Sequence, residues 1–436
     1  MRVDIEELLD RATLGPLHWR VLILCALVAL LDGYDIQAMA SAIPSLAADW
    51  HVAPGALRWI VTAALIGIAG AALLVSPLGD YLGRRTVLLC SFALVGAATL
   101  GAASARDQQA LFLWRLLTGI GLGASLPNAL ALTTEYAPAG RRTMLVALMA
   151  CGISLGAAAS GFIAPPLIEI GGWRAVFAAG GVAALLAWLP LLALPESLRF
   201  LVARGRAPAT VGRLLEQLEP RYRFAAGHQY GLQEVVGRAL SVRQLLTPRL
   251  APSTLLLWLV FFLNLGLLYL LSSWLPALLR ESGMPLSAAL RVAAMFQIGG
   301  VLGGFALAWL MQRWGPYWVL IASYLLTAGA LAVLGAGVPG IALTMLLIVV
   351  MGNGVVGGQV ALNTLSATLY PTTARATGVG WALGMGRFGG IVAPLAAGSL
   401  MAAGVPTGQL FRLATLPTLV CATGVALLRK AVLRSR

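Results

Sequence analysis

The chain has 436 residues, of which 59% are apolar and only 11% are charged. Its mean hydropathy of +0.88 excludes an ordinary water-soluble domain. The formal net charge of +14 could indicate a nucleic-acid partner, but the basic residues lie in alternate connections between apolar runs. The positive-inside rule of membrane proteins explains that distribution, so no nucleic-acid partner is expected.

Apolar segments long enough to cross a bilayer recur along the chain. A first set covers 20–46, 58–79, 86–104, 108–135, 141–168 and 173–194, and a second covers 253–280, 287–312, 316–337, 339–370, 375–402 and 408–430. Each has the roughly 17–25 residues that about 30 Å of hydrocarbon requires. The expected fold class is an all-α integral membrane protein with about twelve transmembrane helices in two six-helix bundles.

The arginines set the expected domains and orientation. They cluster after the second span, after the fourth, between the two sets and past the last span. We therefore expect an N-terminal bundle (1–194), a cytoplasmic linker (195–252) and a C-terminal bundle (253–436), with both termini in the cytoplasm. The N-terminus has no short apolar region before a small-residue cleavage site, so the first span is expected to be retained in a cytoplasmic (inner) membrane.

The two sets of spans contain an internal repeat. In the first set GDYLGRRTVLL links spans two and three, and in the second MQRWGPYWVLI links spans eight and nine. Superposing Gly83 on Gly315 places Asp80 over Gln312, and the segments APAGRRT and PTTARAT align at almost the same offset. Duplicated halves are typical of transporters that bind a ligand centrally and rock around it.

Two aspartates lie inside the first span, in the stretch LLDGYDIQAMA. Asp32 and Asp35 are three residues apart, so on a helix they share one face. Two carboxylates so placed in a medium of low dielectric constant repel each other, which favours a proton on one of them and indicates a proton carrier. The alternative is a pair that only forms a salt bridge to a neighbouring helix. Gly33 between them suggests local flexibility.

Two arginines lie inside later spans. Arg115 begins RLLTGIGLG, whose glycines allow close packing of helices, although an arginine near a helix end can instead reach the membrane interface. Arg387 lies deep in the eleventh span and must face an anion or water. Its planar fork suits a carboxylate, either that of a ligand or that of Asp32 or Asp35.

These patterns resemble the major facilitator superfamily. The linking loop is similar to its G-x-x-x-D-R-x-G-R-R motif, with matches at Asp80, Gly83, Arg84 and Arg85 and departures at Ser76 and Tyr81. Within the superfamily, LDGYD resembles the D-G-x-D motif of the aromatic acid:proton symporters. The stretches WRLLTGIGLGASLPNALALTTEYAP and YPTTARATGVGWALGMGRFGGIVAP are similar to the same group.

The resemblance implies uptake of a small aromatic carboxylate together with protons, by alternating access. It assigns Asp32, Asp35 and Arg115 to proton coupling and Arg387 to the substrate. An aromatic substrate also needs flat surfaces, and buried amides need partners. The further candidates for substrate binding are Tyr34, Asn128, Tyr269, Gln359, Asn363 and Trp381.

The linking loop is expected to act as a gate. Asp80 would accept hydrogen bonds from the N-terminus of a facing helix, and Arg84 would pair with Glu135 or another carboxylate at the end of the fourth span. The remaining gating candidates are Gly83, Arg85, Arg142 and Arg375. In the second half Gln312 replaces the expected acid, so that half of the lock should be weaker.

Other classes of function fit less well. A proton-coupled exporter of drugs or metabolites on the same fold is the alternative, but GISLGAAASGFIAPP lacks the G-x-x-x-G-P-x-x-G-G pattern of antiporters. An enzyme is not expected, because the chain has no H-E-x-x-H or G-x-S-x-G motif. The four cysteines are too scattered for a zinc site and are expected to be small core residues. No cofactor is expected, and the fold usually works as a monomer.

Overall fold

The structure is a computed structural model that describes residues 2–205, 208–218, 229–231, 245–248, 250–338, 340–370 and 372–435. The helices of the first half are α2 (Pro16–Asp49), α3 (Arg58–Leu74), α4 (Gly79–Leu82), α5 (Arg84–Ala103), α6 (Gln108–Tyr136) and α7 (Arg142–Leu191). Those of the second half are α10 (Ala251–Glu281), α11 (Leu286–Trp314), α12 (Pro316–Ala336), α13 (Ile341–Gly352), α14 (Gly358–Leu369), α15 (Thr372–Ala402) and α16 (Thr407–Ser435).

Among the described residues, 11 helical segments are long and apolar enough to cross a membrane. One of them, Ala139–Leu191, is broken by non-helical backbone angles at Gly171 and Gly172 and therefore supplies two spans. The twelve expected spans are thus present. Backbone groups in hydrocarbon must find their partners within the chain, which explains why almost the whole of each apolar run is helical.

The chain divides into two compact units. The first comprises Met1–Asp35, Ala63–Gly156 and Phe177–Val236. The second comprises Ile36–Thr62, Ala157–Val176 and Gly237–Arg436. The boundaries fall inside α2, α3 and α7, so the units differ from the bundles expected from the sequence. The second unit includes parts of first-half helices: Gly161 of α7 lies against Ala294 of α11, and Arg58 of α3 lies against Gly398 of α15.

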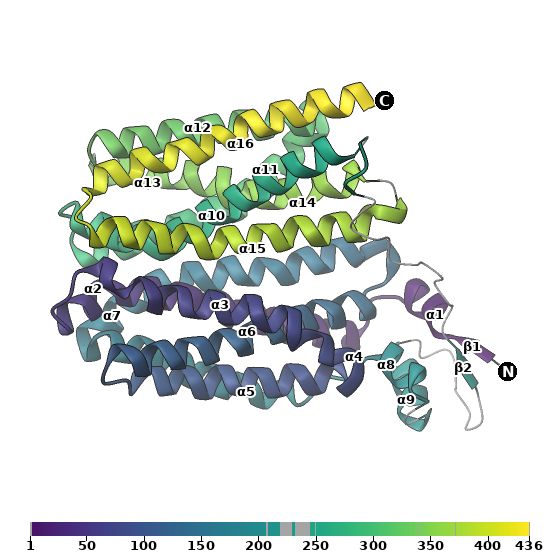
Figure 1. Ribbon diagram of the computed structural model, residues 1–436. Coiled ribbons are helices and arrows are strands. Elements are labelled where there is room, and N and C mark those ends of the chain that lie inside the picture. Colours follow the sequence, from purple (N-terminus) through teal and green to yellow (C-terminus); the bar gives the residue numbers. More distant parts are fainter. Residues whose placement is uncertain are drawn as a thin grey trace. The chain divides into compact units, whose positions relative to one another are not determined.

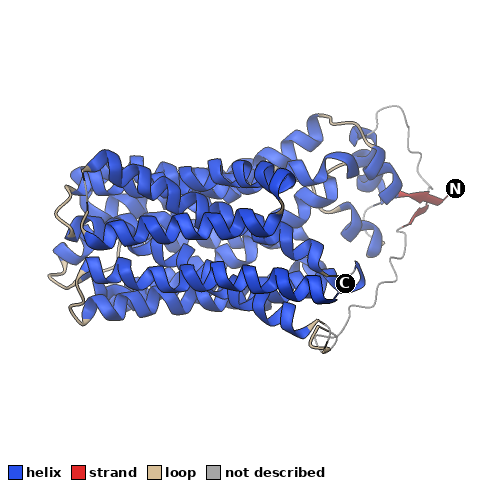
Figure 2. Ribbon diagram, turned by 90° about the horizontal axis from the view of Figure 1, so that it is seen from above, coloured by secondary structure: helices blue, strands red, loops and turns tan. Residues whose placement is uncertain are grey.

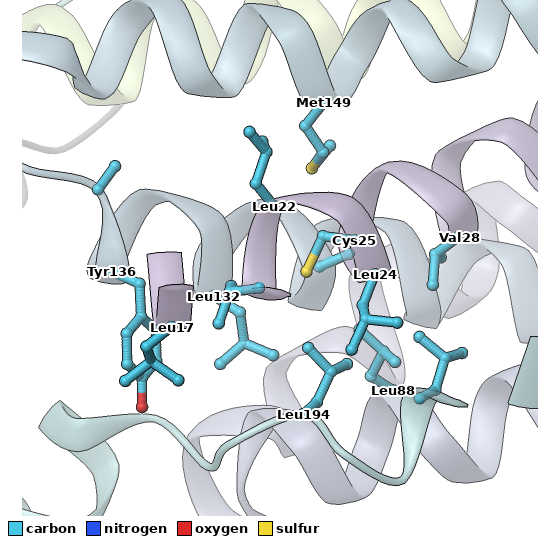
Figure 3. Packing of buried hydrophobic residues seen from close by; sticks show 14 of the residues in the cluster. Leu17, Leu22, Leu24, Cys25, Val28, Leu88, Leu132, Tyr136, Met149 and Leu194 are labelled. Atoms are coloured by element: carbon cyan, nitrogen blue, oxygen red, sulfur yellow. The ribbon is translucent and has the colours of Figure 1, made fainter. Parts of the chain in front are cut away.

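The core of the first unit is made of leucine-rich helix faces. Figure 3 shows Cys25 of α2 among Leu132 of α6, Met149 of α7 and Leu88 of α5. Cys25 is fully buried, as expected for a small core residue. Cys90, by contrast, is exposed.

The N-terminus and the linker form a small structure that the sequence analysis did not anticipate. Strand β1 (Arg2–Asp4) pairs in parallel with β2 (Gln229–Gly231), as the red arrows in Figure 2 show. Helix α1 (Ile5–Arg11) contributes Ile5 and Leu9 to the same core as α8 (Leu198–Ala203) and α9 (Pro208–Leu218). Part of the linker therefore folds with the N-terminus in the first unit.

In the second unit α10 packs closely along α15, and α12 along α16 (Figure 1). A Cβ added at Gly389 of α15 would overlap the carbonyl oxygen of Phe262 in α10. The span that contains α13 and α14 is interrupted by a π-helical turn at Asn353–Gly357. Such turns leave backbone groups out of the regular helical pattern and often occur at functional sites.

The structure supports the predicted internal repeat at its two linking loops. Gly83 ends α4 and precedes α5 with a φ of +101°, and Gly315 ends α11 and precedes α12 with a φ of +81°. Both positions lie in the left-handed region that favours glycine. The predicted superposition thus places equivalent turns on each other.

Candidate functional site

The first unit contains a buried ion pair between helices α2 and α6. Nη1 of Arg115 lies 2.8 Å and 3.0 Å from the two carboxylate oxygens of Asp35, which also accepts a hydrogen bond of 3.1 Å from the hydroxyl of Thr99. Arg115 is 1% exposed and Asp35 4%. Asp32, one turn earlier on α2, is equally buried. The predicted coupling residues are therefore brought together, in the pairing that the sequence analysis gave as the alternative.

The pair does not satisfy all of its donors. Nε of Arg115 is buried without a hydrogen-bond partner among the described residues, because a single nitrogen of the guanidinium serves both oxygens of Asp35. The guanidinium also lies 5.5 Å from the ring centre of Phe177 in α7. A buried guanidinium with an unsatisfied N–H lowers the stability of the folded protein. We therefore expect the pair of Arg115 and Asp35 to rearrange when the charge of Asp35 changes.

Glycines bring the neighbouring helices close to this pair. A Cβ at Gly119 would overlap the carbonyl oxygen of Ala64 in α3, which confirms the predicted close packing of the glycine-rich helix. A Cβ at Gly33 would likewise overlap the carbonyl oxygen of Ile153 in α7. Gly33 thus serves close packing, where the sequence analysis expected flexibility. Tyr34 is buried, with its ring against Gly180.

The second unit contains a chain of uncharged hydrogen bonds across three helices. The hydroxyl of Tyr324 in α12 donates to Asn264 in α10 at 3.0 Å, and Asn264 donates to Gln359 in α14 at 2.8 Å. Gln359 then donates to Asn363, one turn further along α14, at 3.1 Å. We call these four residues the amide relay. It runs from the fully buried Tyr324 to the exposed Asn363.

Arg387 lies half-buried on α15 of the same unit. Its side chain makes no hydrogen bond or salt bridge to any residue that the structure describes, in contrast to Arg115. A guanidinium stays charged at physiological pH, so at this depth it needs water or an anion.

Aromatic side chains of α10 lie beside α15. The ring of Tyr269 lies over Gly390 of α15. Trp381 is 45% exposed and stacks on Trp258, with ring centres 5.7 Å apart. The indole N–H of Trp258 is buried without an acceptor in the described part of the chain. These rings offer flat surfaces along the α10–α15 pair.

The predicted pairing of Arg84 with Glu135 is present in the structure. Glu135, at the end of α6, also accepts from the hydroxyl of Ser197 in front of α8. Glu135 therefore connects the end of α6 with the start of α5 and with the beginning of the linker. Glu135 is 4% exposed, so it is held in a largely desolvated environment.

A second acid, Glu196, binds the same loop and was missed from the sequence. Its carboxylate accepts from the backbone N–H of Arg85 at 3.0 Å, and Arg85 donates to the carbonyl of Leu192 at 2.7 Å. A Cβ at Gly83 would overlap the Glu196 carboxylate. The signal was an acid directly after the sixth span, but its partner on another helix could not be read from the sequence.

Other gating candidates differ from expectation. The side chain of Asp80 is 70% exposed and contacts only Arg84 among the described residues, at 3.4 Å, because Arg84 lies one turn further along the loop. The expected contact of Asp80 with a facing helix N-terminus is absent there. Arg142 pairs with Asp10 of α1 at 2.5 Å. The side chain of Arg375 lies outside the described residues.

Asn128, which was expected in a binding cavity, hydrogen-bonds to backbone carbonyls in the structure. Its amide donates to the carbonyl of Ala124 at 2.8 Å and to that of Ser76 at 3.4 Å. A Cβ at Gly79 would overlap its oxygen. Its polar atoms are therefore engaged by the loop after α3, which explains how a buried amide is tolerated there.

The fold and these sites define a membrane transporter, because two related sets of spanning helices carry ionisable residues deep in the spans. The family model of the major facilitator superfamily matches residues 25–394 and 292–434.

Known proteins agree with this class. The chain is 37% identical to a 4-hydroxybenzoate transporter, PcaK, of Pseudomonas aeruginosa, over 98% of this chain and 96% of that one. It is also 37% identical to a gallate transporter of Pseudomonas putida, over 97% and 94%. A crystal structure of a D-xylose-proton symporter superposes with a TM-score of 0.72 and 17% identity, covering 93% of this chain and 97% of that one. The chain belongs to the major facilitator superfamily, in the family that includes these two relatives, and is a transporter rather than an enzyme.

Proposed function

We propose that the protein takes up a small aromatic carboxylate together with protons across the bacterial cytoplasmic membrane, by alternating access. The observation that carries the proposal is the separation of two kinds of charged site. A buried carboxylate–arginine pair lies in the first unit, and an arginine without a described partner lies in the second. The names of the two relatives support an aromatic carboxylate as the substrate.

The first site supports proton coupling. Protonation of Asp35 would remove the charge that holds Arg115, whose Nε already lacks a partner. Breaking a buried pair in this way changes the free energy by several kcal/mol, which is enough to favour one conformation over another. Asp32, one turn away, offers a second carboxylate for the same proton or for another. The number of protons carried per substrate therefore depends on both residues.

The second site supports binding of an anion. Arg387 can bind a carboxylate with two parallel hydrogen bonds, and the rings of Tyr269 and Trp381 on the α10–α15 pair can contact an aromatic ring. One proton carried with one monoanion moves no net charge. Uptake would then follow the pH gradient, with about tenfold accumulation per pH unit.

Alternating access is supported by contacts inside the second unit. A Cβ at Gly55, just before α3, would overlap the backbone of Ala402 at the end of α15. Gly161 of α7 lies against Ala294 of α11 in the same way. We assign these contacts to the closed periplasmic end. The loop residues Gly83, Arg84 and Arg85, together with Glu135, would form the cytoplasmic gate, joined by Arg142 and Arg375.

The test is uptake of labelled 4-hydroxybenzoate into proteoliposomes that contain the purified full-length protein, with the outside more acidic than the inside. The proposal predicts accumulation that collapses when a protonophore is added. Liposomes without protein and liposomes without a pH gradient are the controls. Extrusion of dyes or metabolites driven by acid, with no uptake of any aromatic acid, would instead support an exporter.

A further inference from the structure

The orientation of every amide in the relay is fixed by one backbone carbonyl. Asn264 Nδ2 lies 3.2 Å from the carbonyl oxygen of Val355, which is part of the π-helical turn. A carbonyl only accepts, so the atom of Asn264 that faces it must be the amide nitrogen. The oxygen of Asn264 therefore faces Tyr324, whose hydroxyl donates to it.

The same logic continues to the exposed end. The atom of Gln359 that faces the nitrogen of Asn264 must be its oxygen, so the Gln359 nitrogen donates to the oxygen of Asn363. Asn363 consequently presents its own N–H donors outwards. They have no acceptor among the described residues. The π-helical turn thus sets the donor-to-acceptor direction of the whole chain of hydrogen bonds. The chain ends at Asn363, whose uncharged N–H donors lie beside its own amide oxygen.

An exposed amide within a membrane span needs water or a polar ligand, since lipid cannot satisfy it. Asn363 lies within the span Ile341–Ser366. An N–H donor next to a carbonyl acceptor matches a hydroxyl group, which both accepts and donates one hydrogen bond. A carboxylate only accepts hydrogen bonds, so it would use the N–H donor and leave the carbonyl acceptor unused. A guanidinium matches a carboxylate better.

The Asn264 end of the relay lies at the depth of Arg387. Leu265 of α10 packs on Gly386 of α15, and these residues are the chain neighbours of Asn264 and Arg387 respectively. One residue along a helix is a rise of about 1.5 Å, so the two polar groups are level within about a helical turn. A ligand held by its carboxylate at one of them can place a ring substituent at the depth of the other.

We infer that Asn363 and Gln359 recognise a hydroxyl group on the aromatic ring, so that the protein prefers hydroxylated aromatic acids to unsubstituted ones. This inference rests on the proposed function. The buried members, Tyr324 and Asn264, hold the half-buried amide of Gln359 and the exposed amide of Asn363 in a single orientation. They act as positioning residues, because the ligand would touch only Asn363 and Gln359.

The test is a comparison of binding affinities for benzoate and 4-hydroxybenzoate, measured by calorimetry on the purified full-length protein. The wild type should bind 4-hydroxybenzoate more tightly. Asn363→Ala should weaken that binding about tenfold, the worth of one net hydrogen bond, and leave benzoate unchanged. Thr364→Val is the matched control, because within the described part of the chain the Thr364 hydroxyl bonds only to the carbonyl of Val360 in its own helix.

A positioning variant adds a second readout. Tyr324→Phe removes the buried hydroxyl without reaching the exposed end, and should reduce the preference for 4-hydroxybenzoate less than Asn363→Ala does. Equal binding of the two acids by the wild type, or equal weakening of both by Asn363→Ala, would overturn the inference while leaving the proposed function intact. Failure of the wild type to bind either acid would overturn the proposed function as well.

Discussion

The buried ion pair of the first unit and the arginine site of the second differ in the burial and in the pairing of their arginines. Arg115 is almost fully buried and paired with Asp35, whereas Arg387 is half-buried and pairs with no described residue. The partner of Arg115 is a charged residue, Asp35, whereas the amide relay near the depth of Arg387 is uncharged. A buried ion pair suits a group that responds to protons, and an arginine without a described partner suits a group that receives an anion.

The two linking loops also differ in their charged contacts, which are present in the first half and replaced by an uncharged side chain in the second. In the first half Asp80 and Glu135 both contact Arg84. In the second half Gln312, at the position of Asp80, is exposed and makes no side-chain hydrogen bond to a described residue. The turn geometry at Gly83 and Gly315 is shared, so the repeat preserves the backbone while the charges have diverged.

The largest effect is expected at Asp35. Asp35→Asn should abolish accumulation against a gradient, because the amide cannot carry the proton. It also leaves the Arg115 guanidinium buried beside a neutral group, which costs about 3–5 kcal/mol of stability. The double variant Asp35→Asn with Arg115→Gln removes that penalty, so it should fold and still fail to accumulate. Accumulation at the wild-type level in either protein would contradict the coupling role.

The next largest effect is expected at Arg387. Arg387→Lys keeps the charge and loses the planar fork, so affinity for aromatic carboxylates should fall by about tenfold or more. Arg291→Lys, at an exposed position of α11, is the control and should bind as the wild type does. Calorimetry measures the binding affinity of both variants. Unchanged affinity in Arg387→Lys would contradict bidentate binding of the substrate carboxylate by Arg387.

A smaller effect is expected from helix packing at the second site. Gly389→Ala forces a Cβ onto the backbone of Phe262 and should lower the free energy of unfolding by about 1–3 kcal/mol. Gly384→Ala, on the same helix, meets open space and should be tolerated. Thermal unfolding in detergent compares the two. Equal melting temperatures would mean that α10 and α15 are not as closely packed as described.

The smallest effect is expected at the surface pair of Arg142 and Asp10. Both side chains are partly exposed, so Arg142→Ala should change stability by only about 0.2–1 kcal/mol. The same variant measured at high salt should differ even less from the wild type, because salt screens exposed charges. A loss of several kcal/mol would show that α1 anchors the loop between α6 and α7 more strongly than one exposed pair can.

The sequence predicted the transmembrane spans closely because hydrocarbon permits little besides helices. It also predicted the contact of Arg84 with Glu135, since both flank the same face of the membrane. It did not predict the β1–β2 pair, because a three-residue strand has no periodic signal. The π-helical turn and the engagement of Asn128 by Ser76 depend on neighbouring helices, which no local pattern reveals.

We propose that the first unit couples protons while Arg387 of the second binds the substrate. Counterflow exchange of labelled 4-hydroxybenzoate, which needs no net proton movement, tests it when measured beside gradient-driven accumulation in the same proteoliposomes. We expect the Asp35→Asn, Arg115→Gln double variant to exchange substrate without accumulating it, and Arg387→Lys to lose both activities in parallel. Loss of exchange in the double variant together with full exchange in Arg387→Lys would contradict it.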